Sequence, residues 1–251
     1  MSRVVLITGS SGIGAATARL ATQRGDRVFL AGKDGQECER LSAQLKDSAF
    51  EVADVTDENA VSAAIESGLS RFGRIDSVFN AAGMSGRSFG DGPLDECSAA
   101  AWRQMMDVHA SGTFFVCRAV IRHWMATKQA GAILNMSSVL ARFPESKFFA
   151  AHAYAASKGA VESLTLAAAG YYAPHGIRLN VLAPALVRTP MSARAQSDPA
   201  ILNFMKEKQP LKAGLLEPDE VARAAYFLLS DESFPITGEV IRIDAGWAVA
   251  G

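Results

Sequence analysis

Residues 4–14 decide the fold of this chain: Val4-Val5-Leu6-Ile7-Thr8-Gly9-Ser10-Ser11-Gly12-Ile13-Gly14. The apolar run that begins at Val4 is typical of a buried strand, and Gly12 opens a helical pattern. Glycines in such a turn let the backbone approach a nucleotide pyrophosphate, which free N–H groups at a helix N-terminus bind. The spacing is G-x-x-x-G-x-G, and an ordinary strand–helix turn is the alternative. The place of the loop after the first strand favours dinucleotide binding, with candidate contacts at Gly9, Ser11, Gly12, Ile13 and Gly14.

Short β-branched runs alternate with longer helical patterns along the rest of the chain. We predict strands over Val4–Thr8, Arg27–Ala31, Ala49–Ala53, Ser77–Asn80, Gly131–Met136, Arg178–Ala183 and Glu239–Ile243. We predict helices over Gly12–Arg24, Asp34–Lys46, Asp57–Phe72, Ala99–Met125, Ala151–Tyr172 and Pro218–Leu229. This alternation indicates βαβ units that build a parallel sheet with helices on both faces.

The chain shows no repeat and no linker, so one domain over residues 1–251 is the simplest organisation. Residues 184–216 form a long segment with weak periodicity that contains Pro190, Pro199 and Pro210. Long segments of this kind in compact domains are often functional, so we interpret it as a substrate-binding lid. A surface excursion without a role is the alternative.

Composition narrows the classes of partner. The net charge of −1 gives no reason to expect nucleic acid or an anionic membrane. The apolar run at the N-terminus is too short for a signal sequence, and no segment approaches the roughly 18 apolar residues of a membrane-spanning helix. The three cysteines lack CxxC spacing, which predicts a cytoplasmic protein without a disulfide framework. We expect no metal site, because the histidines are scattered.

Tyr154 and Lys158 stand four residues apart in a long helical pattern, so they share one face of the helix. A tyrosine hydroxyl has a pKa of about 10 and is inactive as a base at neutral pH. A lysine ammonium alongside favours the phenolate and lowers that pKa, and a cationic oxidised nicotinamide would add to the effect. Taken alone the pair is a weak signal, because this spacing is common on exposed helices.

Together these elements resemble the short-chain dehydrogenase/reductase family, in its single-domain form of about 250 residues. The resemblance rests on motifs that occur in the family's order over almost the whole chain. They are the glycine loop at 8–14, Asn-Ala-Ala-Gly at 80–83, Asn-Met-Ser-Ser-Val at 135–139, Tyr-x-x-x-Lys at 154–158, Asn-x-x-x-Pro at 180–184 and Asp-Ala-Gly at 244–246.

The resemblance implies a Rossmann fold, with a doubly wound parallel sheet of seven strands. It implies that Ser138 hydrogen-bonds the substrate oxygen, that Lys158 binds the nicotinamide ribose and lowers the pKa of Tyr154, and that Tyr154 passes the proton. Asp54 would lie at the adenine with Val55 beside it, and Thr189 near the carboxamide. The other cofactor contacts that it implies are Asn80, Ala81, Gly83, Pro184 and Val187.

Three positions depart from the family pattern. In Val108-His109-Ala110-Ser111-Gly112, His109 replaces the asparagine that helps to hold a proton-relay water. It is either a relay residue, with an ionisation near about pH 6–7 in the rate profile, or a packed helix residue. Ser138 and Tyr154 stand sixteen residues apart, a slightly longer interval than the family's, which places extra residues within Arg142–His152 and keeps Ser137 as an alternative serine. Ala185 and Ala245 replace glycines, which raises a question about the backbone conformation there.

The leading function is reversible oxidoreduction of an alcohol or ketone, with hydride passing to or from a nicotinamide. The alternatives are a non-catalytic dinucleotide sensor or scaffold, and an epimerase or dehydratase with a larger C-terminal domain. The sequence does not name the substrate. The residues that favour an apolar pocket, or that serve core packing instead, are Phe89, Phe143, Phe148, Phe149, Leu186 and Met191.

The cofactor is predicted to be NADP(H), with NAD(H) as the alternative. NAD-preferring enzymes place a carboxylate at the end of the second strand, and a cation there accommodates a 2′-phosphate. Gly32 occupies the acidic position and Lys33 follows it, whereas a slip of one residue would make Asp34 the ribose acid.

The resemblance also implies a homo-oligomer, most simply a homotetramer. The helix over 151–172 is rich in alanine, and the C-terminal Trp247-Ala248-Val249-Ala250 is apolar. Packing within one subunit is the alternative for both.

Overall fold

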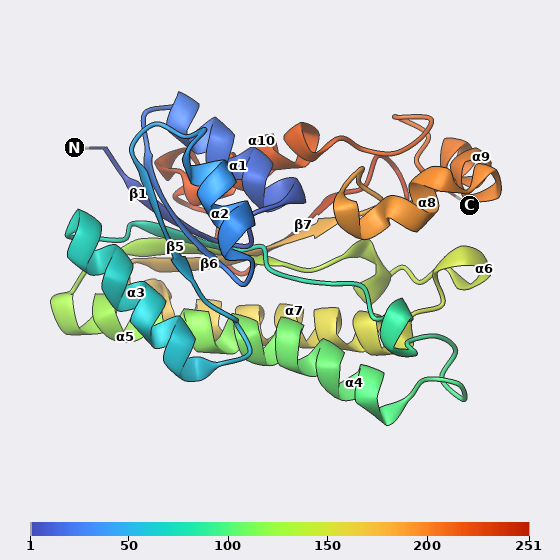
Figure 1. Cartoon of the computed structure of the whole chain (residues 1–251), viewed down its shortest axis with the longest axis horizontal. Helices are drawn as coiled ribbons and strands as arrows, with labels where there is room; N and C mark the ends of the chain where they lie inside the picture. The colour runs from blue at the N-terminus through green and yellow to red at the C-terminus, as the bar shows by residue number, and fades with distance from the viewer. Residues whose placement is uncertain (1, 251) are drawn as a thin grey trace.

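A computed structural model of the chain (Figure 1) describes residues 2–250. It contains one parallel sheet in the order β3-β2-β1-β4-β5-β6-β7. This confirms the doubly wound seven-stranded sheet that the sequence predicts. The strands are β1 (Val4–Thr8), β2 (Arg27–Gly32), β3 (Ser48–Val52), β4 (Ser77–Asn80), β5 (Gly131–Met136), β6 (Ile177–Pro184) and β7 (Val240–Ile243). Chain order reverses between β1 and β4, and ligands of open parallel sheets bind at such a point, beyond the carboxyl ends of the strands.

Residues of β1 alternate between two hydrophobic cores. Val5 and Ile7 pack into the core on one face of the sheet, and Val4 and Leu6 pack into the core on the other. Because both faces are covered, the strand is a continuous apolar run rather than an alternating one. This explains why residues 4–8 are wholly buried.

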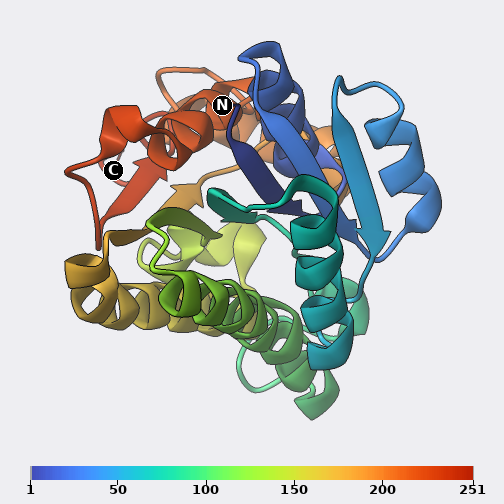
Figure 2. The ribbon, with the colours of Figure 1, turned by 90° about the vertical axis from the view of Figure 1, so that its left-hand side faces the viewer.

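Two layers of helices cover the sheet (Figure 2). On one face lie α1 (Gly12–Gln23), α2 (Gly35–Ser42) and α10 (Pro218–Leu229), whose side chains share a core. On the other face lie α3 (Glu58–Phe72), α5 (Gly112–Thr127) and α7 (His152–Tyr172). Within residues 2–250, no helix has the length and apolar character needed to cross a membrane.

The helix predicted over Ala99–Met125 is interrupted in the structure. It divides into α4 (Ala99–Met105), a π-helical segment (Met106–Ser111) and α5. A π segment inserts an extra residue into a turn, which an apolar period of 3.6 does not reveal. His109 lies in this segment.

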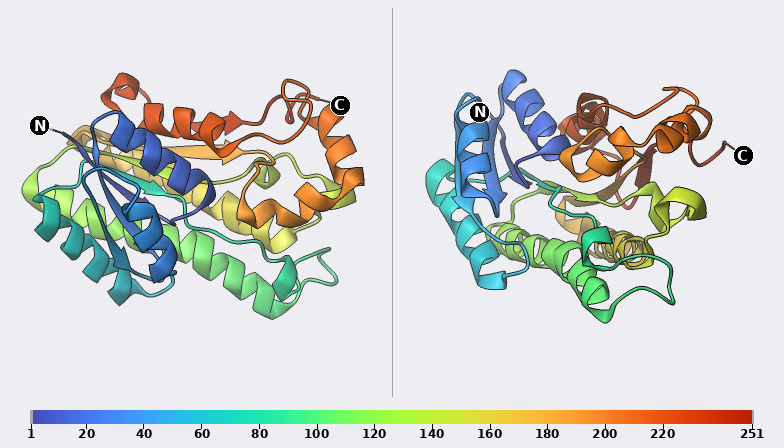
Figure 3. Two further views of the ribbon diagram at one scale, coloured as in Figure 1. Left: turned by 45° about the horizontal axis from the view of Figure 1, so that its top comes forward. Right: turned by 45° about the vertical axis from the view of Figure 1, so that its right-hand side comes forward.

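Residues 184–216 are more regular than the sequence suggests. They contain α8 (Ala193–Ser197) and α9 (Pro199–Lys208), which lie at the same end of the molecule as the C-terminus (Figure 3). They pack against α6 (Ser146–Phe149), which lies within the segment where the extra residues were expected, and the ring centroids of Phe148 and Phe204 are 5.3 Å apart.

The C-terminal segment packs largely inside the subunit. Trp247 is only 2% exposed, belongs to the core beside α8 and α9, and donates a hydrogen bond to the carbonyl of Phe143. Trp247 therefore does not require a second subunit to cover it, although Val249 is 85% exposed.

Candidate active site

The glycine loop joins β1 to α1 and touches the segment that follows β4. Gly9 has a φ of 87° and Gly12 a φ of 51°, and residues with a Cβ atom rarely adopt such positive values. A Cβ on Gly9 would lie 3.3 Å from the Cα of Ala82, and one on Gly14 would lie 2.8 Å from the carbonyl oxygen of Gly9. The Ser11 side chain makes no capping hydrogen bond, so the N–H groups of the first turn of α1 remain available to an anion.

Charged residues gather where β2 and β3 end. Lys33 and Asp54 form an ion pair 2.7 Å long, with the lysine side chain 81% exposed. Asp34, the alternative ribose acid, accepts a hydrogen bond from the N–H of Glu37 and caps α2.

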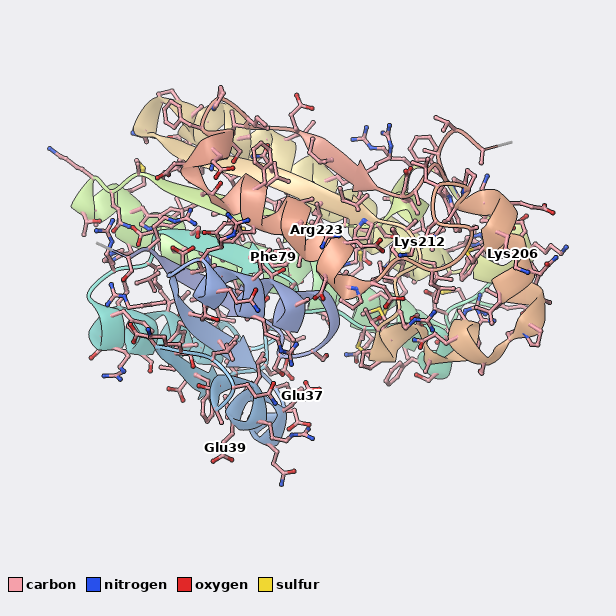
Figure 4. All side chains as sticks on the ribbon, turned by 90° about the horizontal axis from the view of Figure 1, so that it is seen from above. Glu37, Glu39, Phe79, Lys206, Lys212 and Arg223 are labelled. Carbon is pink, nitrogen blue, oxygen red and sulfur yellow. The ribbon has the colours of Figure 1, made fainter. Side chains whose placement is uncertain are left out.

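Glu37 is a residue of this region that sequence reasoning missed. Its carboxylate accepts a hydrogen bond of 2.7 Å from the hydroxyl of Ser10 in the glycine loop. Figure 4 shows Glu37 on α2, far from Lys206 on α9. Glu37 therefore belongs to the end of the site near β2, and no sequence motif marks it.

Ser138, Tyr154 and Lys158 meet beyond the carboxyl end of β5. Ser138 caps a short 3-10 helix, Val139–Ala141, by accepting from the N–H of Leu140 at 3.3 Å, and its hydroxyl opposes the rise that burial causes in the pKa of Tyr154, with which it lines one cavity. The Nζ atom of Lys158 lies 5.6 Å from the centre of the Tyr154 ring and donates to the carbonyl of Met136 at 2.9 Å. The structure thus brings together the serine, tyrosine and lysine that the sequence predicted as a group.

Burial dominates the ionisation of the tyrosine and the lysine. It raises the pKa of Tyr154 above the ordinary value, and the hydrogen bond with Ser138 only opposes this shift. It lowers the pKa of Lys158 from 10.5 to about 7. Within residues 2–250, burial therefore raises the pKa of Tyr154 by more than its neighbours lower it. The resemblance, in contrast, implies that Lys158 lowers this pKa.

Ser137, the alternative serine, is engaged elsewhere. Its hydroxyl donates to the carboxylate of Glu162 at 2.9 Å, and Glu162 is buried and paired with Arg142. Ser138 is consequently the serine whose hydroxyl remains available on the cavity that Tyr154 also lines.

His109 is buried, and both of its ring nitrogens have partners. Nε2 accepts a hydrogen bond of 3.1 Å from the N–H of Met84, so the ring proton is on Nδ1, which lies 2.8 Å from the hydroxyl oxygen of Ser157. That hydroxyl donates in turn to the carbonyl of Tyr154 at 2.7 Å. Burial, and then the charge of Lys158, hold the pKa of His109 well below 6.5, which moves its ionisation below the range expected from the sequence.

Asp91 is a second residue that sequence reasoning missed. Its buried carboxylate accepts hydrogen bonds of 3.0 Å from the N–H groups of Ala153 and Tyr154, in the first turn of α7. Asp91 therefore holds the backbone of Tyr154 from a position 63 residues earlier in the chain. A turn-like Asp-Gly-Pro sequence carries no sign of so distant a partner.

One cavity of about 610 Å³ extends from the glycine loop to Tyr154. The predicted residues that line it are Gly9, Ser11, Gly12, Ile13, Gly14, Ala81, Gly83, Ser138, Tyr154, Lys158, Pro184, Val187 and Thr189. Those outside its lining are Lys33, Asp54, Val55, Asn80 and His109. Asn80 instead donates to the side chain of Asn135 in the next strand, at 2.8 Å. Of the expected apolar residues, Phe149, Leu186 and Met191 line the cavity, whereas Phe89, Phe143 and Phe148 do not.

Comparison with known proteins places this geometry in a family. Residues 7–248 match the profile of the family described as enoyl-(acyl carrier protein) reductase. The chain is 34% identical over 250 residues to cis-4-hydroxycyclohexanecarboxylate dehydrogenase of Sinomonas cyclohexanicum, covering 98% of this chain and 96% of that protein. A short-chain type dehydrogenase/reductase from Mycobacterium ulcerans has a similar structure, with a TM-score of 0.91, 28% identity and coverage of 100% and 92%. The chain belongs to the short-chain dehydrogenase/reductase family.

A structure with a nicotinamide cofactor supports the binding site. The 3-ketoacyl-(acyl-carrier-protein) reductase from Brucella melitensis, complexed with NADH, has a TM-score of 0.87 and 30% identity, with 98% of each chain covered. The site of this chain fits such a dinucleotide, because the first turn of α1 has no side-chain cap and Ser11, Gly12 and Ile13 line the cavity that reaches Tyr154. The chain is therefore an oxidoreductase of the family, and its cofactor is a nicotinamide dinucleotide.

The two alanines that replace family glycines differ in conformation. Ala245 has a φ of 49°, in the left-handed region that favours glycine. Ala185 does not have a positive φ, and its N–H donates to the carbonyl of Ile243 at 3.1 Å. The substitution therefore strains the backbone at Ala245 alone.

Proposed function

We propose that this enzyme interconverts an alcohol and a ketone, with NADP(H) as the hydride carrier and Tyr154 as the acid/base. The observation that carries the proposal is the meeting of Ser138, Tyr154 and Lys158 on a cavity that continues to the glycine loop. The bound nicotinamide supplies or accepts the hydride.

The side chains of the site have separate tasks in this proposal. Ser138 hydrogen-bonds the substrate oxygen, and the hydroxyl of Tyr154 gives a proton to that oxygen or takes one from it. A positive charge near Tyr154 favours the phenolate that oxidation of an alcohol requires. Lys158 has a pKa of about 7, so it can give or take a proton at neutral pH and pass it toward solvent.

His109 is proposed to act as a positioning residue for this relay. Its two ring nitrogens are bonded to Met84 and Ser157, which supports holding Tyr154 in place over binding a water. The ring also packs edge-on against the ring of Tyr154, with centroids 5.2 Å apart.

The preference for NADP(H) rests on the end of β2. Gly32 leaves no carboxylate at the first position, the carboxylate of Asp34 caps α2, and the exposed Lys33 is free to turn from Asp54 toward a 2′-phosphate. The opposing observation is Glu37, whose carboxylate lies at the glycine loop and could accept from a ribose hydroxyl.

We further propose that residues 184–216 close over the substrate and that the protein is a cytoplasmic homotetramer. The lid is supported by Leu186 and Met191, which line the cavity. Assembly is supported by exposed apolar side chains on the helical layer formed by α4, α5 and α7, namely Trp102, Phe114, Leu166 and Tyr171. Light scattering at micromolar concentration tests it, and a monomer mass would refute the tetramer.

The test of the function is nicotinamide absorbance with a panel of alcohols and ketones, each assayed with NADP(H) and NAD(H). We expect turnover of at least one pair, faster with the phosphorylated cofactor. Binding of the dinucleotide without any turnover would instead support a sensor or scaffold of the same fold.

A further inference from the structure

Two arginines meet at the rim of the cavity that contains Tyr154. Arg87 follows β4 and begins a short 3-10 helix, Arg87–Phe89, whereas Arg194 lies on α8 of the lid. The Nη2 atom of each donates to the same acceptor, the carbonyl oxygen of Phe148, at 2.6 Å for Arg87 and 3.0 Å for Arg194. Both line the cavity. Two positive charges, one from the loop after β4 and one from α8, are therefore held side by side on the cavity.

No carboxylate within residues 2–250 forms an ion pair with either of these arginines. The cavity lining contains Arg87, Lys158 and Arg194 but, within the described part of the chain, no aspartate or glutamate. Asp91 acts on Arg87 only through its charge, because its own carboxylate accepts from the backbone of α7. Burial, and then the charge of Arg194, lower the pKa of Arg87, and the charge of Asp91 only opposes this shift.

We propose that Arg87 and Arg194 bind a carboxylate on the substrate, so that this enzyme acts on hydroxy acids and keto acids. A guanidinium has five N–H donors, and the shared carbonyl takes one from each arginine. The remaining donors suit the two oxygens of a carboxylate, which guanidinium groups bind in paired hydrogen bonds. The inference rests on the proposed function, since the carboxylate would anchor the molecule whose carbonyl or hydroxyl faces Tyr154.

The same cavity also has apolar lining that suits the body of such a substrate. Leu140, Phe149, Leu186 and Trp247 line the same cavity, and Phe149 packs against Trp247 with ring centroids 5.8 Å apart. A substrate with an apolar body, an oxygen at one end and a carboxylate at the other would match each part of the cavity.

The test compares keto acids with their methyl esters, over a graded spacing between the carbonyl and the carboxylate. The variants are Arg87→Gln, Arg194→Gln and the double variant, with Arg71→Gln as a matched control, because Arg71 lies at the far end of α3 outside the cavity. We expect the wild-type and control proteins to favour at least one acid over its ester. Each single variant should lose roughly tenfold or more in kcat/KM for that acid, and the rate with the ester should stay unchanged.

Binding measurements separate this inference from the proposed function. Calorimetry with the enzyme saturated in NADP+ measures the affinity for each acid and ester without requiring turnover. Acids that bind through the two arginines but are never reduced would support the carboxylate site and refute the dehydrogenase. Turnover with equal preference for acid and ester, or equal losses for both in the variants, would refute the carboxylate site alone. Weaker dinucleotide binding in the Arg87 and Arg194 variants would also refute the carboxylate site, since the two arginines would then bind the cofactor.

Discussion

The Nδ1 atom of His109 lies 2.8 Å from the hydroxyl oxygen of Ser157, which donates to the carbonyl of Tyr154 in the preceding turn of α7. The chain of hydrogen bonds runs from the N–H of Met84 through the imidazole to Ser157 and on to the carbonyl of Tyr154. It ties the loop after β4 and the π segment to the helix that carries the tyrosine. Only the neutral imidazole can make this connection, because Nε2 must be unprotonated to accept from the N–H of Met84.

Substitution of His109 tests that chain. His109→Asn keeps an acceptor and a donor and should retain most activity, whereas His109→Leu leaves buried groups unpaired. We expect His109→Leu to slow turnover by at least about tenfold and to destabilise the fold by about 1–3 kcal/mol. Dinucleotide affinity should change little. Full turnover and unaltered melting of His109→Leu would show that the imidazole is only packing.

Acidification tests the neutral state of His109. The folded protein holds its pKa well below 6.5, so the unfolded chain binds a proton that the native state does not. Its contribution to stability is present above the unfolded pKa of about 6.5 and is lost as pH falls toward the folded pKa. Denaturant titrations should show wild-type losing more stability than His109→Asn below that pH, and parallel losses would contradict the assignment.

Substitution of Asp91 tests whether its carboxylate positions Tyr154 through the first turn of α7. Asp91→Ala removes the acceptor for the buried N–H of Ala153 and the part-buried N–H of Tyr154, and should destabilise the protein by about 2 kcal/mol, with a lower kcat. Asp91→Asn keeps one acceptor oxygen and should lose less. Chemical denaturation and turnover of the two variants check this order. Equal, wild-type values for both would exclude a positioning role.

The lowered pKa of Lys158 makes the free energy of unfolding depend on pH in the alkaline range. Its folded pKa of about 7 lies below the unfolded value, so the unfolded chain binds more protons between these values. Stability attributable to this residue therefore rises between about pH 7 and the unfolded value of 10.5, by up to about 1.4 kcal/mol per pH unit. The difference in unfolding free energy between wild-type and Lys158→Met should follow this slope. A difference independent of pH would mean that the lysine stays charged in the fold.

Substitution of Lys33 tests the proposed preference for NADP(H) over NAD(H). Lys33→Glu places a carboxylate near the 2′ position and should weaken NADP binding by at least about tenfold, with little loss for NAD. Calorimetry with both dinucleotides measures the two effects. A wild-type protein that binds NAD more tightly than NADP would reverse the proposal and favour Glu37 as the ribose acid.

The parts of the fold that depend on local sequence were predictable. The strand, loop and helix at residues 4–23 follow from the apolar run and the glycines, and β4, β5 and α10 begin and end where predicted. Tyr154 and Lys158 share a helical face by spacing alone. The resemblance adds Ser138, whose neighbour Ser137 is engaged by Glu162 in the fold.

The remaining parts depend on contacts between distant residues. The π segment around His109 adds a residue to a turn without a change in composition. Asp91 meets the N-terminus of α7 only after folding, and Arg87 and Arg194 converge only through the carbonyl of Phe148. Packing of Trp247 inside the subunit likewise follows from α8 and α9, which weak periodicity concealed.

The most direct test of the central claim is the turnover of Tyr154→Phe, measured by nicotinamide absorbance with a substrate that the wild-type enzyme reduces. Phenylalanine preserves the ring beside His109 and removes only the hydroxyl that is proposed to transfer the proton. We predict that kcat falls by at least about 100-fold, the usual scale of losing a positioned acid/base, while dinucleotide binding stays close to wild-type. A Tyr154→Phe enzyme that keeps most of the wild-type kcat would contradict the account.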